Sequence, residues 1–127
     1  MMTRHYAGFK GRLASFKYAF RGIRVMMANE PNARVHAAVT AVVVGAGIYF
    51  ELGVGAWCWI VLSIVSVWTA EAINTAFEAL ADVASPNFHP MVEIAKDVAA
   101  AAVLITSVGA AVIGLLVFGP HMFRAAP

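Results

Sequence analysis

Three long apolar segments dominate this sequence and limit what it can fold into. Residues 35–50 are interrupted only by His36 and Thr40, and residues 54–70 and 98–118 contain no charged side chain. A helix needs about 20 apolar residues to cross the hydrocarbon core of a bilayer. The last segment reaches that length alone, and the other two reach it with their flanking residues. We therefore expect three transmembrane helices.

The composition agrees with a membrane location. Of the 127 residues, 61% are hydrophobic and only 13% are charged, whereas a soluble domain carries about 25% charged residues. The length fits one domain over residues 1–127. The formal net charge is +2, so we expect no nucleic-acid partner and instead contact with membrane lipids.

Positive charge gathers near the N-terminus. Six basic residues precede the first acidic residue: Arg4, Lys10, Arg12, Lys17, Arg21 and Arg24. Beside a membrane, a basic stretch marks the cytoplasmic face and contacts anionic lipid head groups. We therefore expect the N-terminus and the loop at residues 82–95 on the cytoplasmic side, and the turn at residues 51–55 outside.

Apolar residues inside this basic segment recur at steps of three and four. They form one face of a helix: Phe9, Leu13, Phe16, Phe20, Ile23 and Met27. An apolar stripe opposite cationic residues is typical of a helix that lies in the membrane interface. We expect an amphipathic surface helix at about residues 8–29. The alternative is a helix that only packs on other helices.

Helix-breaking residues divide the rest of the chain into three helices. We expect these helices at about residues 32–50, 54–84 and 91–118, the second extending past its apolar segment into the cytoplasm. The segment from Ser85 to Pro90 separates the last two, and Gly119-Pro120 ends the third. The sequence thus predicts an all-α integral membrane protein.

A polar stripe follows the second apolar segment on the same helix. At 100° per residue, four side chains share one narrow face: Glu71, Asn74, Glu78 and Asp82. Carboxylates at a membrane edge are costly and usually mark function. Acids on one stripe repel each other unless a cation lies among them, and Mg²⁺ binds one or two carboxylates together with water and phosphate oxygens. The alternative is a solvated polar face.

Lys96 and Asp97 lie at the cytoplasmic entry of the last apolar segment. A lysine in this position can neutralise phosphate charge as a point cation. The alternative is an interfacial anchor whose aliphatic stem lies along apolar surface. The sequence has neither a G-x-x-x-x-G-K-[ST] nor a G-x-G-x-x-G motif, so phosphate binding would not use either of those loops.

These polar residues form part of a longer pattern. It consists of E-A-I-N-T-A-F-E at residues 71–78, then Asp82, then His89-Pro90, then A-K-D at residues 95–97 with small residues after it. This pattern resembles the prokaryotic diacylglycerol kinase family. A segment before the first span resembles the family too: Asn29, Glu30, Arg34 and His36. The likeness covers roughly residues 9–118.

The resemblance implies an ATP-dependent lipid kinase that forms homotrimers of three-span subunits with active sites between subunits. Glu71 would be the general base on the lipid hydroxyl, and Glu30 and Glu78 would hold Mg²⁺. Asn74 and Asp82 would support the site. ATP would also contact several further residues: Tyr18, Asn87, His89, Lys96 and Asp97. Contact with the lipid substrate would involve Arg12, Arg34 and His36, with Arg12 replacing a family arginine that falls nearest Gly11.

The family includes kinases of diacylglycerol and of undecaprenol. The spacing Asn32-x-Arg34-x-His36 and the Ser85-Pro86-x-x-His89-Pro90 loop favour the undecaprenol branch. We expect a multi-pass protein of the bacterial inner membrane with its active site facing the cytoplasm. A proton-coupled transporter that uses Glu71, or a non-catalytic membrane subunit, are the competing interpretations.

Overall fold

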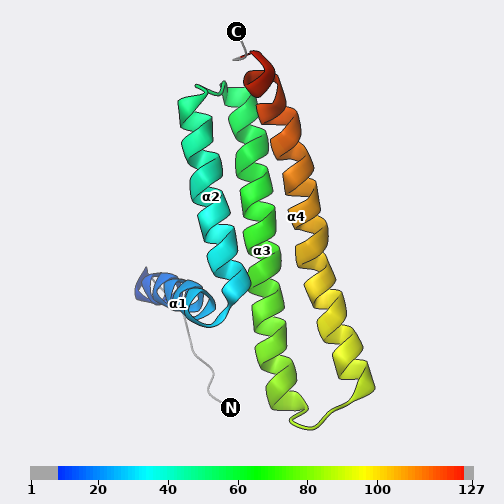
Figure 1. Cartoon of the computed structure of the whole chain (residues 1–127). Helices are drawn as coiled ribbons and strands as arrows, with labels where there is room; N and C mark the ends of the chain where they lie inside the picture. Colours follow the sequence, from blue (N-terminus) through cyan, green and yellow to red (C-terminus); the bar gives the residue numbers. More distant parts are fainter. Residues whose placement is uncertain (1–8, 125–127) are drawn as a thin grey trace.

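The computed structural model describes residues 9–124, and within them every regular element is a helix. The helices are α1 (Phe9–Asn29), α2 (Pro31–Tyr49), α3 (Val54–Ala84) and α4 (Pro90–Arg124). Helices α2, α3 and α4 run side by side, while α1 lies across the start of α2 and against α3 (Figure 1). Residue 8, where we expected the surface helix to begin, and Arg4 of the basic segment lie outside the described residues.

The break between α1 and α2 is fixed by local chemistry. Glu30 has an extended backbone, and Pro31 occupies the first turn of α2, where its missing N–H costs nothing. Arg34 then reaches back and donates hydrogen bonds to the carbonyl oxygens of Met27 and Ala28. These carbonyls end α1 and have no partner within the helix, so the guanidinium serves as a C-terminal cap.

The turn between α2 and α3 is a tight helical hairpin. The N–H of Leu52 donates to the carbonyl of Gly47, and the N–H of Glu51 donates to that of Ile48. Glu51 has a φ of 50°, the left-handed conformation that closes this kind of helix end. Leu52 is buried over Gly47, and a Cβ atom on Gly47 would lie 2.8 Å from the Trp57 ring. A small residue is therefore needed where the two helices meet.

Two of the helices are long and apolar enough to cross a membrane, namely α3 and α4. With 31 and 35 residues, they are about 46 and 52 Å long, more than the roughly 30 Å hydrocarbon core. Both helices are therefore longer than the hydrocarbon core requires. Helix α2 has 19 residues and carries Asn32, Arg34 and His36 in its first two turns, which lower its mean hydropathy.

The C-terminal end of α4 corrects one sequence-based expectation. We expected Gly119-Pro120 to end the helix, but α4 continues through Pro120 to Arg124. Proline removes one backbone donor, and near a helix end the remaining turn can be held by other contacts. The Phe50 ring lies 6.1 Å from Phe118 and 5.7 Å from His121, measured between ring centroids. Packing against the end of α2 therefore holds this turn.

Candidate active site

The buried face of α3 leads directly into the polar stripe. Its buried residues recur at steps of three and four: Ile60, Ser63, Val67, Glu71 and Asn74. The face of α3 that packs against other helices therefore carries mostly apolar side chains up to Val67, and a carboxylate and an amide at Glu71 and Asn74. Glu78 is half-buried one turn further on, and Asp82 is exposed. Solvent exposure therefore increases along the stripe, from buried Glu71 to exposed Asp82.

Glu71 occupies the buried end of the polar stripe. Its side chain is 0% exposed, and it is the largest fully buried side chain in the described chain. Neither carboxylate oxygen has a hydrogen-bond partner there, and the nearest basic atom is Nε2 of His36 at 3.7 Å. Buried carboxylates are normally paired, because an unpaired one loses its solvation without compensation. Glu71 is therefore an exception to this rule among the described residues.

Neighbouring polar groups share this property. Oδ1 of Asn74 and Oγ1 of Thr75 are also buried without hydrogen-bond partners in the described structure. The amide nitrogen of Asn74 donates to Oε1 of Glu78 at 3.1 Å, which orients both side chains. Glu30 and Glu78 act electrostatically on Glu71. Glu30, Glu71 and Glu78 are therefore close enough for their charges to interact, although Glu30 lies far from the other two in the sequence.

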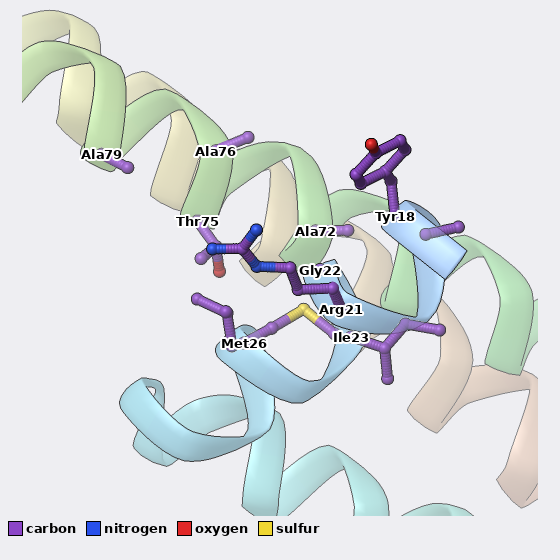
Figure 2. Close-up of a pocket in the computed structure, with 11 residues that line it drawn as sticks. Tyr18, Arg21, Gly22, Ile23, Met26, Ala72, Thr75, Ala76 and Ala79 are labelled. Atoms are coloured by element: carbon purple, nitrogen blue, oxygen red, sulfur yellow. The ribbon is translucent and has the colours of Figure 1, made fainter. Parts of the chain in front are cut away.

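A cavity of about 470 Å³ lies between α1 and α3. Figure 2 shows its walls, with Tyr18, Arg21, Gly22, Ile23 and Met26 on α1 and Ala72, Thr75, Ala76 and Ala79 on α3. Small side chains on α3 let α1 approach closely. Thr75 and Arg21 add polar groups to an otherwise apolar wall. Tyr18, which we assigned to ATP binding from the sequence, lines this cavity.

A second, polar cavity of about 360 Å³ lies at the α3–α4 loop. It gathers five of the predicted site residues: Asp82, Asn87, His89, Lys96 and Asp97. Nζ of Lys96 donates to Oδ1 of Asp82 at 2.9 Å. Lys96 precedes the apolar segment, and this hydrogen bond raises its pKa above the ordinary lysine value. A lysine ammonium group at this position acts as a point cation, which suits an anionic ligand.

Local hydrogen bonds shape this loop. The Ser85 hydroxyl donates to the carbonyl of Asn87 at 2.9 Å, and Nδ1 of His89 accepts the Met91 N–H at 3.2 Å. His89 therefore caps the start of α4, where backbone N–H groups lack helical partners. The N-terminus of α4 and Lys96 face one cavity, an arrangement that suits an anionic ligand.

Other predicted residues lie apart from these clusters. Arg12 is exposed on α1, and Arg34 is engaged with the carbonyls that end α1. Two polar residues that the sequence analysis did not assign to the site line cavities outside the loop cluster. Arg21 lines the cavity between α1 and α3, and Ser107 has a buried hydroxyl on α4. A serine inside an apolar segment was the available signal for Ser107, but serines there commonly bond to their own helix.

Within residues 9–124, no three His, Cys, Asp or Glu side chains come together closely enough to hold a metal ion by themselves. This excludes a metal cage of the zinc type in the described part of one chain. It leaves room for Mg²⁺, which takes one or two carboxylates and completes its shell with water and phosphate oxygens. Glu30 and Glu78 are carboxylates of the type that Mg²⁺ accepts.

Comparison with known proteins finds a family model that matches most of the chain. The family model for prokaryotic diacylglycerol kinase matches residues 17–118. The chain belongs to the prokaryotic diacylglycerol kinase family. It is therefore a membrane-associated lipid kinase, with ATP as the phosphate donor and a lipid alcohol as the acceptor. The resemblance inferred from the sequence is confirmed.

Three relatives in this family show its range. The chain is 38% identical to a protein named undecaprenol kinase from Bacillus subtilis over 108 residues, covering 85% of this chain and 88% of the relative. It is 33% identical to a diacylglycerol kinase from Synechocystis, covering 80% of this chain and 59% of that relative. A diacylglycerol kinase from Escherichia coli is 24% identical, with 94% and 98% covered.

Proposed function

We propose that this kinase transfers the γ-phosphate of ATP to undecaprenol at the cytoplasmic face of a bacterial inner membrane. Two observations support undecaprenol over diacylglycerol. The relative named undecaprenol kinase is 38% identical, against 33% and 24% for the two named diacylglycerol kinases. The Asn32-x-Arg34-x-His36 spacing favours the same branch. Diacylglycerol is the second candidate.

The observation that carries the mechanism is the buried, unpartnered carboxylate of Glu71 at the end of an apolar segment. In the proposed step, Glu71 accepts the proton of the lipid hydroxyl. The oxygen then bonds to the γ-phosphorus, the bond to the bridging oxygen breaks, and ADP leaves with that electron pair. A base at the bilayer edge meets a hydroxyl whose tail stays in the hydrocarbon. Phosphoryl transfer needs such positioning and charge neutralisation more than covalent help.

The remaining roles follow the two clusters. Glu30 and Glu78 would hold Mg²⁺, which when bound neutralises charge on the ATP phosphates. Asn74 supports Glu78 through its hydrogen bond, and Asp82 supports Lys96. The other ATP contacts would come from the α3–α4 loop cavity and the α1 cavity: Tyr18, Asn87, His89, Lys96 and Asp97. Arg12, Arg34 and His36 are the proposed lipid contacts, Arg34 through its hold on α1.

We also propose that three subunits assemble, each with three spans, α2 being the third. Only 6% of the most apolar stretch of α4 is buried in one chain, so its surface is available to lipid and to other copies. Glu71 and the Asp82 end of the loop cavity are 11 residues apart on α3, roughly 16 Å along a helix. A loop cavity contributed by a neighbouring subunit would shorten this distance.

The transporter interpretation of Glu71 is set aside. A transporter would place its key acid within a span, whereas Glu71 follows the uncharged segment and continues into the stripe of Glu78 and Asp82. The family assignment decides between the two in favour of the kinase.

The direct test measures transfer of label from γ-labelled ATP to lipid by purified protein in mixed micelles. Undecaprenol and diacylglycerol are offered side by side, with and without Mg²⁺. We expect labelled undecaprenol to form faster, and only with Mg²⁺. Faster labelling of diacylglycerol would assign the other branch, and labelling that persists after chelation of all divalent metal would contradict the role of Mg²⁺.

A further inference from the structure

A third cavity lies among α2, α3 and α4, on the far side of His36 from the α3–α4 loop. It has a volume of about 350 Å³ and a largely apolar lining. Its few polar groups come from all three helices: His36, Thr40, Ser63, Trp68 and Ser107. Nε1 of Trp68 donates to Oγ1 of Thr40 at 3.0 Å, and the Ser63 hydroxyl donates to the Trp59 carbonyl at 2.8 Å. His36 and Ser107 therefore remain as the unpartnered polar groups of this cavity.

His36 links this cavity to Glu71. Its side chain is 17% exposed, and its Nε2 lies 3.7 Å from Oε2 of Glu71. Both atoms are buried without a hydrogen-bond partner in the described structure. A small rotation of either side chain closes this distance to a hydrogen bond, and catalytic contacts commonly tighten when substrate binds.

Other groups near Glu71 are less suited to hold it. The Asn74 amide nitrogen is engaged with Glu78. Among residues 9–124, His36 is the only basic side chain within 4 Å of the Glu71 carboxylate. A carboxylate without a donor rotates about its last side-chain bond, which spreads its basic lone pairs over many directions. A general base works efficiently only when it is aimed at the proton it accepts.

We propose that His36 is a positioning residue for the general base. Its Nε2–H donates to Oε2 of Glu71 and directs Oε1 towards the lipid hydroxyl. This inference rests on the proposed function, because it assumes that Glu71 accepts that proton. In this role His36 acts on Glu71, and this takes the place of the lipid contact proposed for His36 from the sequence. Positioning affects kcat, whereas lipid contact affects KM for the lipid.

Two variants separate these roles. His36→Gln keeps an N–H donor near the position of Nε2, and His36→Met has a similar length and shape without a donor. Ser107→Ala is the matched control, because it removes the other unpartnered polar group of the same cavity and lies on a different helix. All three are purified in micelles, checked for helix content, and measured for kcat and KM with the lipid that the wild type accepts.

We expect His36→Met to lower kcat about 10- to 100-fold, the scale for a misplaced catalytic group, with KM for lipid within about twofold. His36→Gln should recover most of kcat, and Ser107→Ala should match the wild type. Full kcat in His36→Met, or an equal rise in lipid KM in both His36 variants, would overturn the inference. A wild type that labels neither lipid would instead overturn the proposed function on which it rests.

Discussion

At the scale of single residues, the buried carboxylate of Glu71 lowers stability, and the proposed function gives a reason for its presence. A fully buried carboxylate without a hydrogen bond is destabilising, because it has given up water and received nothing in return. Proteins tolerate such groups mainly where function requires them. The seam of α3 could have continued with an apolar residue at this point, and its packing would have been more stable.

This argument predicts opposite effects of one substitution. Glu71→Gln should lower kcat by about 10²- to 10⁴-fold, since the amide cannot accept the proton. Mg-ATP affinity should stay close to the wild-type value, and the midpoint of thermal unfolding should be unchanged or higher. Turnover, nucleotide binding and thermal unfolding in detergent measure the three quantities. Substantial turnover by Glu71→Gln would end the assignment of Glu71 as the base.

The assignments of Glu30 and Glu78 predict a different pattern. Glu78→Gln and Glu30→Gln should each raise KM for Mg-ATP, because each variant removes one of the two proposed carboxylate ligands. A higher concentration of Mg²⁺ should partly reverse this rise in KM. Titration of Mg²⁺ at fixed ATP measures the effect, with Glu51→Gln as a control in the exposed hairpin turn at the other end of α3. Normal Mg-ATP binding by both variants would show that the metal is held elsewhere.

At the scale of elements, the α2–α3 hairpin holds the two helices in the register that brings His36 opposite Glu71. Its outer end depends on the contact of Trp57 with Gly47 and on buried Leu52. The backbone of Gly47 packs closely against the Trp57 ring at this point. This contact sets the position of α2 along α3, although it lies several turns away from the site. A shift at the hairpin would move His36 along Glu71.

A matched pair of glycine variants tests this contact. Gly47→Val places side-chain atoms into the Trp57 ring, whereas a Cβ on Gly45 meets nothing within 4 Å. Both changes have the same helix propensity, so their difference reports packing. We expect Gly47→Val to be less stable than Gly45→Val by about 1–3 kcal/mol, the usual cost of overpacking. Equal unfolding midpoints in detergent would show that the Trp57 ring moves aside freely.

At the scale of the whole molecule, the proposed orientation places both predicted clusters on one side of the membrane. The hairpin turn containing Glu51 and the loop after Ala84 lie at opposite ends of the bundle (Figure 1). In the proposed orientation, with α2, α3 and α4 all spanning, the hairpin turn would be outside and the loop inside. In this orientation α1 would lie on the cytoplasmic side, where it packs across the start of α2 and against α3 (Figure 1).

Single cysteines can test this topology, because Cys58 is the only cysteine in the sequence. In a Cys58→Ser background, Glu51→Cys should react with a membrane-impermeant maleimide added to intact spheroplasts. Val83→Cys, at a position 82% exposed in the structure, should react only after the membrane is permeabilised. Labelling of both positions from outside would contradict a three-span topology in which both clusters lie on the cytoplasmic side.

The sequence by itself determined the helices, the polar stripe and the family. Apolar segments and breakers act locally, so they set helix positions without knowledge of the packing. Likewise, residues at steps of three, four and seven share a helix face wherever that helix lies, which is why the Glu71 stripe could be predicted. The family pattern, confirmed by the comparisons, supplied the activity that no single motif indicated.

Only the tertiary structure decided what lies around these residues. The approach of His36 to Glu71, the ion pair of Lys96 with Asp82, and the hold of Arg34 on the end of α1 all join separate helices or distant turns. Beyond Pro120, α4 likewise packs against a distant segment, because the His121 ring contacts that of Phe50, the residue after α2. Helix periodicity fixes which side of a helix a residue occupies, but the packing angles and heights of the helices decide which residue it meets.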